Sequence, residues 1–209
     1  MKKNQKTTPA TQFILASASP RRQKLLKEQG YSFKVIVPKT KEISRHYISC
    51  KQAALENARS KAVSVAKNNK DLLVLSADTI VVLKGKILGK PRTKKEALNM
   101  LLRLNNKTHQ VITAYSLVKI SKNKLKVLEQ KAVTSTVSFG NFQRSEYLNY
   151  VNSMEPSDKA GAYGIQGLGA RFVKAFTGSY TNIVGLPVFE IMHALKKVGL
   201  EYPWIGVKK

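Results

Sequence analysis

The chain opens with short apolar runs separated by longer amphipathic stretches. Residues 13–16 and 33–37 have the composition of short strands, and residues 49–67 have the spacing of a helix. Between the two runs, Ser19 suits a helix N-cap and Pro20 suits the first helical position. The first part of the chain therefore predicts strands that alternate with helices.

A longer apolar run covers residues 72–83 and is interrupted by Asp78, a poor strand residue. Either Asp78 caps a turn that breaks the run into two strands, or it stands at a strand end, where ligands bind in α/β proteins. Burying a carboxylate costs several kcal/mol unless it is paired or bound to metal. This cost favours the second interpretation, in which Asp78 is a metal ligand or a general base.

The second half of the chain predicts two long strands joined by a hairpin turn, then a helix, two short strands and a last helix. We expect these elements at residues 109–120, 125–139, 143–152, 172–176, 183–184 and 188–197. The pattern is that of an α/β fold with a mixed, twisted β-sheet and flanking helices. The hairpin around residues 105–140 indicates a second lobe. Residues 1–11 predict a mobile tail, and residues 12–209 predict a single domain.

Composition narrows the class of protein. The 209 residues include 37 Lys and Arg against 12 Asp and Glu, a formal charge of +25 that attracts polyanions. The basic residues are spread along the chain, which fits a solvated lysine-rich surface as well as a nucleic-acid-binding one. No run approaches the ~20 apolar residues of a membrane span. The single cysteine, Cys50, forms no internal disulfide, so we expect a soluble cytoplasmic protein with no membrane partner.

The turn Ser17-Ala18-Ser19-Pro20-Arg21-Arg22 is the first segment that indicates chemistry. Basic residues at a helix N-terminus cost ~0.3–1 kcal/mol. A bound anion would reverse that cost, because the free N–H groups and both guanidinium groups would point at it, and Ser17 could donate as well. The alternative is that Arg21 and Arg22 extend into solvent.

Two further segments are consistent with a nucleotide site. Lys90, between Gly89 and Pro91, could contact phosphate as a point charge, although a surface lysine is the default. Residues 158–167 are rich in glycine and alanine, and Gln166 offers a donor and an acceptor to a base edge. A plain flexible loop fits that composition too, and it matches neither a Walker A loop nor a dinucleotide fingerprint.

The histidines argue against other hydrolase classes. His46, His109 and His193 lie far apart without metal-ligand spacing, so a zinc hydrolase is not expected. A Ser-His-Asp hydrolase would need a G-x-S-x-G elbow, which the chain lacks. We expect His109 to be a hydrogen-bonded residue at the start of a strand.

Taken together, these segments resemble the Maf family of nucleotide pyrophosphatases over nearly the whole chain. The resemblance rests on ILASASPRR (14–22), ADT (77–79), LGKP (88–91), HQVIT (109–113), DKAGAYGIQG (158–167), GSY (178–180) and GLP (185–187). It implies hydrolysis of a nucleoside triphosphate to the monophosphate and pyrophosphate, with Mg²⁺ or Mn²⁺. It also implies an ITPase-like cleft between two lobes, and commonly a homodimer.

The resemblance also implies roles for particular residues. Arg21, Thr79 and Gln166 together are similar to the branch acting on dTTP and UTP, with modified pyrimidine nucleotides as further candidates. Glu42 and Lys61 match a functional carboxylate and a lysine of the family.

In this scheme Asp78 has two tasks and every other group has one. The metal is held by Asp78 and Glu42, and Asp78 orients or deprotonates the attacking water. The triphosphate is bound by Ser17, Arg21, Arg22, Lys61 and Lys90, and the pyrimidine is contacted by Thr79 and Gln166.

One position departs from the family pattern. The family usually has SPRRxELL, and here Lys24 stands where the glutamate is expected. Affinity or rate falls if that acid orders the arginines or helps to bind metal, and little changes if it only caps the helix. The alternative function is a basic nucleic-acid-binding or cell-division regulatory protein with weak or absent nucleotide hydrolysis. Such proteins usually interleave aromatic and basic residues, whereas these motifs surround an acid, which favours the enzyme.

Overall fold

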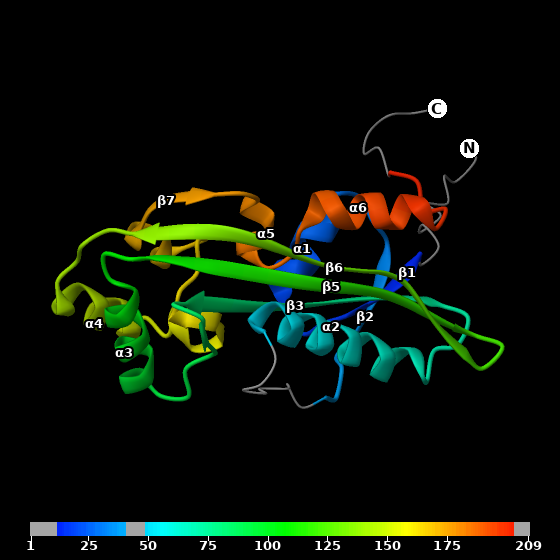
Figure 1. Cartoon of the computed structure of the whole chain (residues 1–209), viewed down its shortest axis with the longest axis horizontal. Helices are drawn as coiled ribbons and strands as arrows, with labels where there is room; N and C mark the ends of the chain where they lie inside the picture. Colours follow the sequence, from blue (N-terminus) through cyan, green and yellow to red (C-terminus); the bar gives the residue numbers. More distant parts are fainter. Residues whose placement is uncertain (1–11, 41–48, 203–209) are drawn as a thin grey trace, which may run out of the picture.

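The computed structural model describes residues 12–40 and 49–202, and in them six α-helices and seven strands (Figure 1). The strands are β1 (Phe13–Ala16), β2 (Phe33–Ile36), β3 (Leu73–Leu83), β4 (Lys86–Leu88), β5 (Thr108–Ser121), β6 (Lys124–Phe139) and β7 (Val173–Thr177). The α-helices are α1 (Pro20–Glu28), α2 (Cys50–Ala66), α3 (Lys94–Leu104), α4 (Arg144–Asn152), α5 (Tyr180–Val184) and α6 (Val188–Lys197). Three 3₁₀-helices complete the set: η1 (Glu155–Asp158), η2 (Ala160–Ala162) and η3 (Leu168–Phe172).

The strands form one mixed sheet in the order β2-β1-β3-β5-β6-β7, and β4 pairs with the end of β3. β1 runs parallel to β2 and β3, and the other pairs are antiparallel. The sheet does not close into a barrel, so the predicted mixed α/β class is confirmed. None of the helices within the described ranges is long and apolar enough to cross a membrane.

The two faces of the sheet are covered by different helices. In β1, Phe13 and Leu15 pack toward α1 and α6, while Ile14 and Ala16 face α2, as the two-residue period of a strand requires (Figure 1). The sheet-facing side of α2 is rich in alanine, and the hydroxyl of Ser76 donates to the carbonyl of Ala58. Small side chains let this helix lie close to β3, which places its polar residues beside the strand.

A second apolar cluster lies at the far end of the sheet, around α3, α4 and η3 (Figure 1). Phe172 is at its centre, in ring contact with Phe142, Tyr147 and Tyr150. The hairpin expected at residues 105–140 is β5–β6. It is part of the single sheet and contributes residues to this cluster and to the one beside α1 and α6, so it does not form a separate lobe.

Two local predictions are wrong. Residues 183–184, expected as a strand, lie in α5, because the side chain of Ser179 accepts from the N–H of Asn182 and starts a helix there. Asp78 neither breaks the run at 72–83 nor stands at a strand end, since it is the sixth residue of the eleven in β3. The neighbouring strand β1 ends instead: it pairs with β3 only as far as Ala16 and Ser76, and after Ala16 the backbone leaves the sheet while β3 continues.

His109 is a buried packing residue at the start of β5, as expected. Its Nε2 lies 2.7 Å from the hydroxyl of Tyr163, and its ring contacts Phe139. Burial lowers the pKa of His109 from 6.5 to about 4, so the ring is neutral at physiological pH. It supports Tyr163, which lines the cleft described below.

We predict that His109 makes the protein acid-sensitive. Because its folded pKa is below the unfolded one, protons bind the unfolded state preferentially between pH 6.5 and 4. This group leaves the free energy of unfolding unchanged above that window and lowers it by about 3 kcal/mol at its acid end. Urea titrations at pH 7 and pH 4 of His109→Gln, which keeps a partner for Tyr163, should lack this loss, whereas His193→Gln on exposed α6 should retain it. Equal losses in both variants would contradict the assignment.

Candidate active site

The turn between β1 and α1 presents an open helix N-terminus. Ser17 is buried, and its hydroxyl accepts from the N–H of Ser19 at 3.1 Å. The side chain of Ser19, the N-cap of α1, makes no capping hydrogen bond, and the first turn of α1 holds no acidic residue. The positive end of this helix and its first N–H groups are therefore not neutralised by a side-chain cap.

Arg22 joins three segments that are far apart in the sequence. Its Nε donates to the carbonyl of Gly185 at 2.9 Å, and its two terminal nitrogens donate to Thr79 Oγ1 at 3.0 Å and Ser17 Oγ at 3.3 Å. The planar, five-donor guanidinium suits such a junction. The carbonyl of Gly185 is presented by a backbone φ of 128°, a conformation that favours glycine.

The hydroxyl of Thr79 is half-buried and lies next to the buried hydroxyl of Thr113. Its Oγ1 is 3.0 Å from Thr113 Oγ1 and 3.3 Å from the carbonyl of Gly185. Thr113 donates in turn to the carbonyl of Asn182 at 2.9 Å. These contacts hold α5 against β3 and β5 at the wall of the cleft.

Asp78 is a buried carboxylate, 4% exposed, with both oxygens engaged. Lys61 Nζ is 2.5 Å from Oδ1, and Asn57 Nδ2 is 3.3 Å from Oδ2. Asn57 and Lys61 are one turn apart on α2, so a single helix face supplies both partners. This pairing offsets the cost of burying Asp78 in mid-strand. Sequence reasoning missed Asn57, although its four-residue spacing from Lys61 on a predicted helix was the available signal.

Residues between Asp158 and Gln166 form the wall opposite the β1–α1 turn, and Glu155 supports the loop to which they belong. The carboxylate of Glu155 accepts from the hydroxyl of Tyr150 and from the N–H groups of Leu168 and Gly169 at 2.9–3.1 Å. A Cβ at Gly169 would meet the carbonyl of Gly164 at 2.5 Å, so no larger residue fits there. Glu155 thus fixes the part of the loop that follows Gln166, a role that the sequence did not indicate.

Asp158 bridges the two walls. Its Oδ2 is 3.1 Å from the guanidinium of Arg21, and its Oδ1 is 2.7 Å from Lys159 Nζ. Burial alone would raise the pKa of Asp158, but the hydrogen bond and charge of Lys159, together with Arg21, outweigh it and hold the pKa below its ordinary value. Asp158 is therefore ionised at neutral pH.

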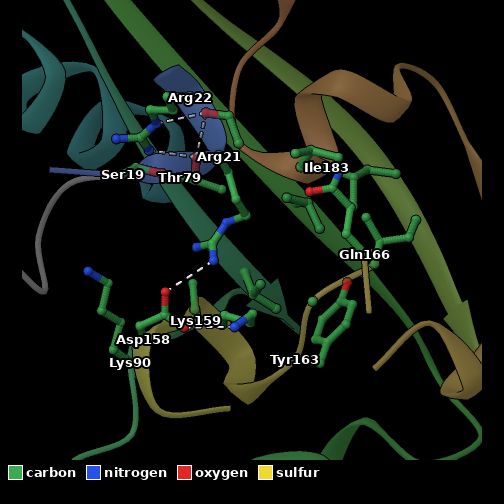
Figure 2. Close-up of a pocket in the computed structure, with 17 residues that line it drawn as sticks. Ser19, Arg21, Arg22, Thr79, Lys90, Asp158, Lys159, Tyr163, Gln166 and Ile183 are labelled. Atoms are coloured by element: carbon green, nitrogen blue, oxygen red, sulfur yellow. Dashed lines mark hydrogen bonds and ion pairs between the residues drawn. The ribbon is translucent and has the colours of Figure 1, made fainter. Parts of the chain in front are cut away.

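These groups line one cleft made of three adjoining hollows, and Arg22 and Lys90 border all three. Figure 2 shows Arg21 at its centre, with Lys90 and Asp158 on one side and Tyr163, Gln166 and Ile183 on the other. The main hollow is lined by Ser19, Arg21, Arg22, Thr79, Lys90, Asp158, Lys159, Tyr163, Gln166 and Ile183, among others. Among the described lining residues, five cationic side chains face two carboxylates, so the cleft suits a polyanionic ligand.

Comparison with known proteins shows the family to which this sequence is related. A family model described as Maf-like protein matches residues 12–198. A protein of Fusobacterium nucleatum named dTTP/UTP pyrophosphatase is 44% identical over 186 residues, which cover 89% of this chain and 95% of the relative. Proteins with the same name from Syntrophus aciditrophicus and Bacillus anthracis are each 42% identical, over 89% and 90% of this chain and 89% and 96% of the relatives.

The chain belongs to the Maf family.

In this Maf-family cleft the predicted site residues are distributed as follows. Arg21, Arg22, Thr79, Lys90 and Gln166 line the main hollow. Lys61 and Asp78 lie in an adjoining one, on the α2 side of Arg22, and Ser17 lies in the hollow beside α1. Glu42 lies outside the described residues.

The departure at Lys24 lies away from the cleft. Its side chain is 72% exposed, and its ammonium is 3.9 Å from Glu28 on the next turn of α1. Exposed ion pairs of this kind contribute ~0–1 kcal/mol. Lys24 therefore does not order Arg21 or Arg22 in this structure.

We predict that Arg22→Lys destabilises the fold. A single ammonium cannot reach the carbonyl of Gly185 and the hydroxyls of Thr79 and Ser17 together, so the free energy of unfolding should fall by about 1–3 kcal/mol. Urea unfolding measures the change. Arg103→Lys, an exposed substitution on α3, is the matched control and should shift stability by less than about 0.5 kcal/mol. Equal stabilities of the two variants would show that Arg22 does not join these segments.

Proposed function

We propose that this protein is a nucleoside triphosphate pyrophosphatase that hydrolyses dTTP and UTP, and modified pyrimidine nucleotides, to the monophosphate and pyrophosphate. The observation that supports this most is the continuity of the cleft. A cationic turn at a helix N-terminus and a buried Lys61–Asp78 pair lie at one end, and the loop with Gln166 lies at the other. The relatives named dTTP/UTP pyrophosphatase support the same substrates.

The triphosphate would lie along the cationic side of the cleft. Arg21, Lys61 and Lys90, with the N-terminus of α1, supply positive charge from three directions. Such preorganised charge stabilises the negative charge that develops on the phosphate oxygens in the transition state. The hydroxyl of Ser17 accepts from the N–H of Ser19 and from Arg22. We assign its own O–H to donate a hydrogen bond to a phosphate oxygen.

We assign Asp78 as the residue that orients and deprotonates the attacking water. Lys61 and Asn57 hold its two oxygens in place, and the side chain borders the cleft. The water oxygen bonds to the α-phosphorus while the bond from that phosphorus to the bridging oxygen breaks. Asp78 takes one proton from the water, and pyrophosphate leaves.

The described residues fit a divalent metal brought in with the substrate. Within residues 12–40 and 49–202 no three His, Cys, Asp or Glu side chains are gathered closely enough to form a preformed cage. Mg²⁺ needs only one or two carboxylates and completes its shell with water and substrate phosphates. We assign Asp78, together with Glu42, to hold Mg²⁺ or Mn²⁺, which would supply charge neutralisation at the phosphate oxygens.

The base would lie at the other end of the cleft. Tyr163 and Ile183 offer an apolar wall, and the side-chain amide of Gln166 offers both a donor and an acceptor to a pyrimidine edge (Figure 2). Thr79 contacts protein groups through its hydroxyl, so we expect it to act on base selection through the position of Gly185.

We predict that Asp78→Asn lowers kcat for UTP at least about a hundredfold, because a general base contributes at least that factor. Pyrophosphate release is measured with Mg²⁺ or Mn²⁺ from dTTP, UTP, CTP, 7-methyl-GTP, ITP, ATP and GTP. The wild type should turn over dTTP and UTP selectively. Asp71→Asn, in an exposed turn before β3, removes the same charge away from the cleft and should match the wild type.

Two results would count against this proposal. If Asp78→Asn hydrolyses UTP at the wild-type rate, the assignment of the base is wrong. If the wild type is silent across the panel and binds arbitrary DNA with a steep salt dependence, the nucleic-acid-binding alternative is favoured.

We also propose that the enzyme is a cytoplasmic homodimer. The family resemblance supports the dimer, and Phe176, Tyr180 and Phe189 expose large aromatic surfaces on β7, α5 and α6. A single cysteine is consistent with a reducing compartment. Sedimentation equilibrium should give twice the chain mass of 23.3 kDa, and a species of 23.3 kDa at assay concentrations would contradict the dimer.

A further inference from the structure

Asp158 lines the cleft without a task in the proposed reaction. It ends η1, yet it contacts Arg21 on α1, 137 residues earlier, through a 3.1 Å ion pair. The side chain of Asp158 is 58% exposed and that of Arg21 is 31% exposed, so water and ligands reach both. Figure 2 shows this pair among the residues that line the main hollow, with Lys90 beside Asp158.

The charge of Asp158 is opposite to what a triphosphate site needs. Arg21 is among the groups expected to contact phosphate, and the carboxylate already occupies a donor of its guanidinium. A carboxylate and a phosphate oxygen are both anionic acceptors that Arg binds in the same way. The two therefore compete for Arg21.

We propose that Asp158 is an internal competitor of the substrate: it occupies Arg21 in the nucleotide-free protein, and a phosphate group displaces it when the nucleotide binds. This inference rests on the proposed function. It makes Asp158 a positioning residue that acts through Arg21, and one that weakens the binding of every ligand that engages Arg21, including a phosphorylated product that must leave.

The surroundings of Asp158 allow the exchange to be a side-chain movement. The ammonium of Lys159 also donates to the carbonyl of Glu155 at 2.6 Å, and this hydrogen bond does not depend on the position of the Asp158 side chain. Glu155 itself is held by the hydroxyl of Tyr150 and by two backbone N–H groups of the loop. The exposed ion pair is weak enough to exchange, because solvent screens it and a multiply charged phosphate chain offers Arg21 a stronger partner.

Binding of inorganic tripolyphosphate, measured by isothermal titration calorimetry, tests the competition without any need for hydrolysis. Asp158→Asn should bind it about two- to fivefold more tightly than the wild type, the range expected for losing a competing exposed ion pair. Asp158→Glu keeps the charge and should restore wild-type affinity. Glu28→Gln, which removes an exposed carboxylate that pairs with Lys24, is the matched control and should leave the affinity unchanged.

A double-mutant cycle separates competition for Arg21 from a general effect of charge. In an Arg21→Gln background, adding Asp158→Asn should change the tripolyphosphate affinity much less than it does in the wild type. For UTP hydrolysis the wild-type background should show a lower KM in Asp158→Asn, without a fall in kcat.

Several outcomes would overturn the inference. Tighter binding that persists equally in the Arg21→Gln background would show that Asp158 repels the ligand through its charge alone and does not compete for Arg21. Weaker binding, or a lower kcat, in Asp158→Asn would place Asp158 among the groups that assist the substrate, and a wild type that binds no tripolyphosphate would leave no competition to relieve. If the wild type binds tripolyphosphate but hydrolyses no nucleotide, the proposed function fails while the calorimetry still decides the role of Asp158.

Discussion

Burial of the Asp78 carboxylate in the middle of a strand is the constraint to which the surrounding structure responds. A carboxyl group that is 4% exposed is tolerated only with partners, and α2 supplies them as Asn57 and Lys61 from adjacent turns. For both to reach β3, α2 must lie close to the sheet, which its alanine-rich face permits. The close packing of α2 on the sheet and the placement of the groups around Asp78 therefore depend on each other. Replacing Asn57 or Lys61 would disturb the packing and the site together.

The ending of β1 gives this carboxylate access to a ligand. A central strand with neighbours on both sides throughout would present Asp78 only to packed side chains. Because β1 stops pairing at Ala16 and turns away into α1, a space opens beside the next residues of β3. The same departure brings Arg22 over Thr79, where it holds the turn, the strand and Gly185 together. One interruption of the parallel pairing therefore creates both the cleft and its cationic border.

The elements that could be predicted from sequence are those with local causes. The start of α1 after Ser19, the hairpin turn between the two long strands and the extent of α2 depend on neighbours in the chain, and they formed where expected. The strand is not interrupted at Asp78, because the cost of burying its carboxyl group is offset by two residues of a helix that lie 17 and 21 positions earlier. Residue type alone indicated a charged group in need of partners, and only the packed structure identified them.

The same distinction explains the candidate site. Arg21, Lys90 and Gln166 belong to recognisable local segments, and the fold brings them to one cleft. The roles of Glu155 and Asp158 could not be predicted from the sequence. Glu155 accepts from backbone groups 13 and 14 residues later, and Asp158 pairs with a residue 137 positions earlier.

The high positive charge of the chain does not by itself select a ligand. A net charge of +25 attracts duplex nucleic acid, single strands and free nucleotides alike, and it acts mainly through the rate of encounter. Selection depends on what can enter the cleft. Asp78 and its partners line a hollow between α2 and β3, and only a ligand that enters this hollow contacts them. The carboxylates set within the cationic surface then act at short range, where a single charge outweighs distant lysines screened by salt beyond about 8–10 Å. On a basic chain, the few acids that line the cleft therefore affect which polyanion binds there more than the net charge does.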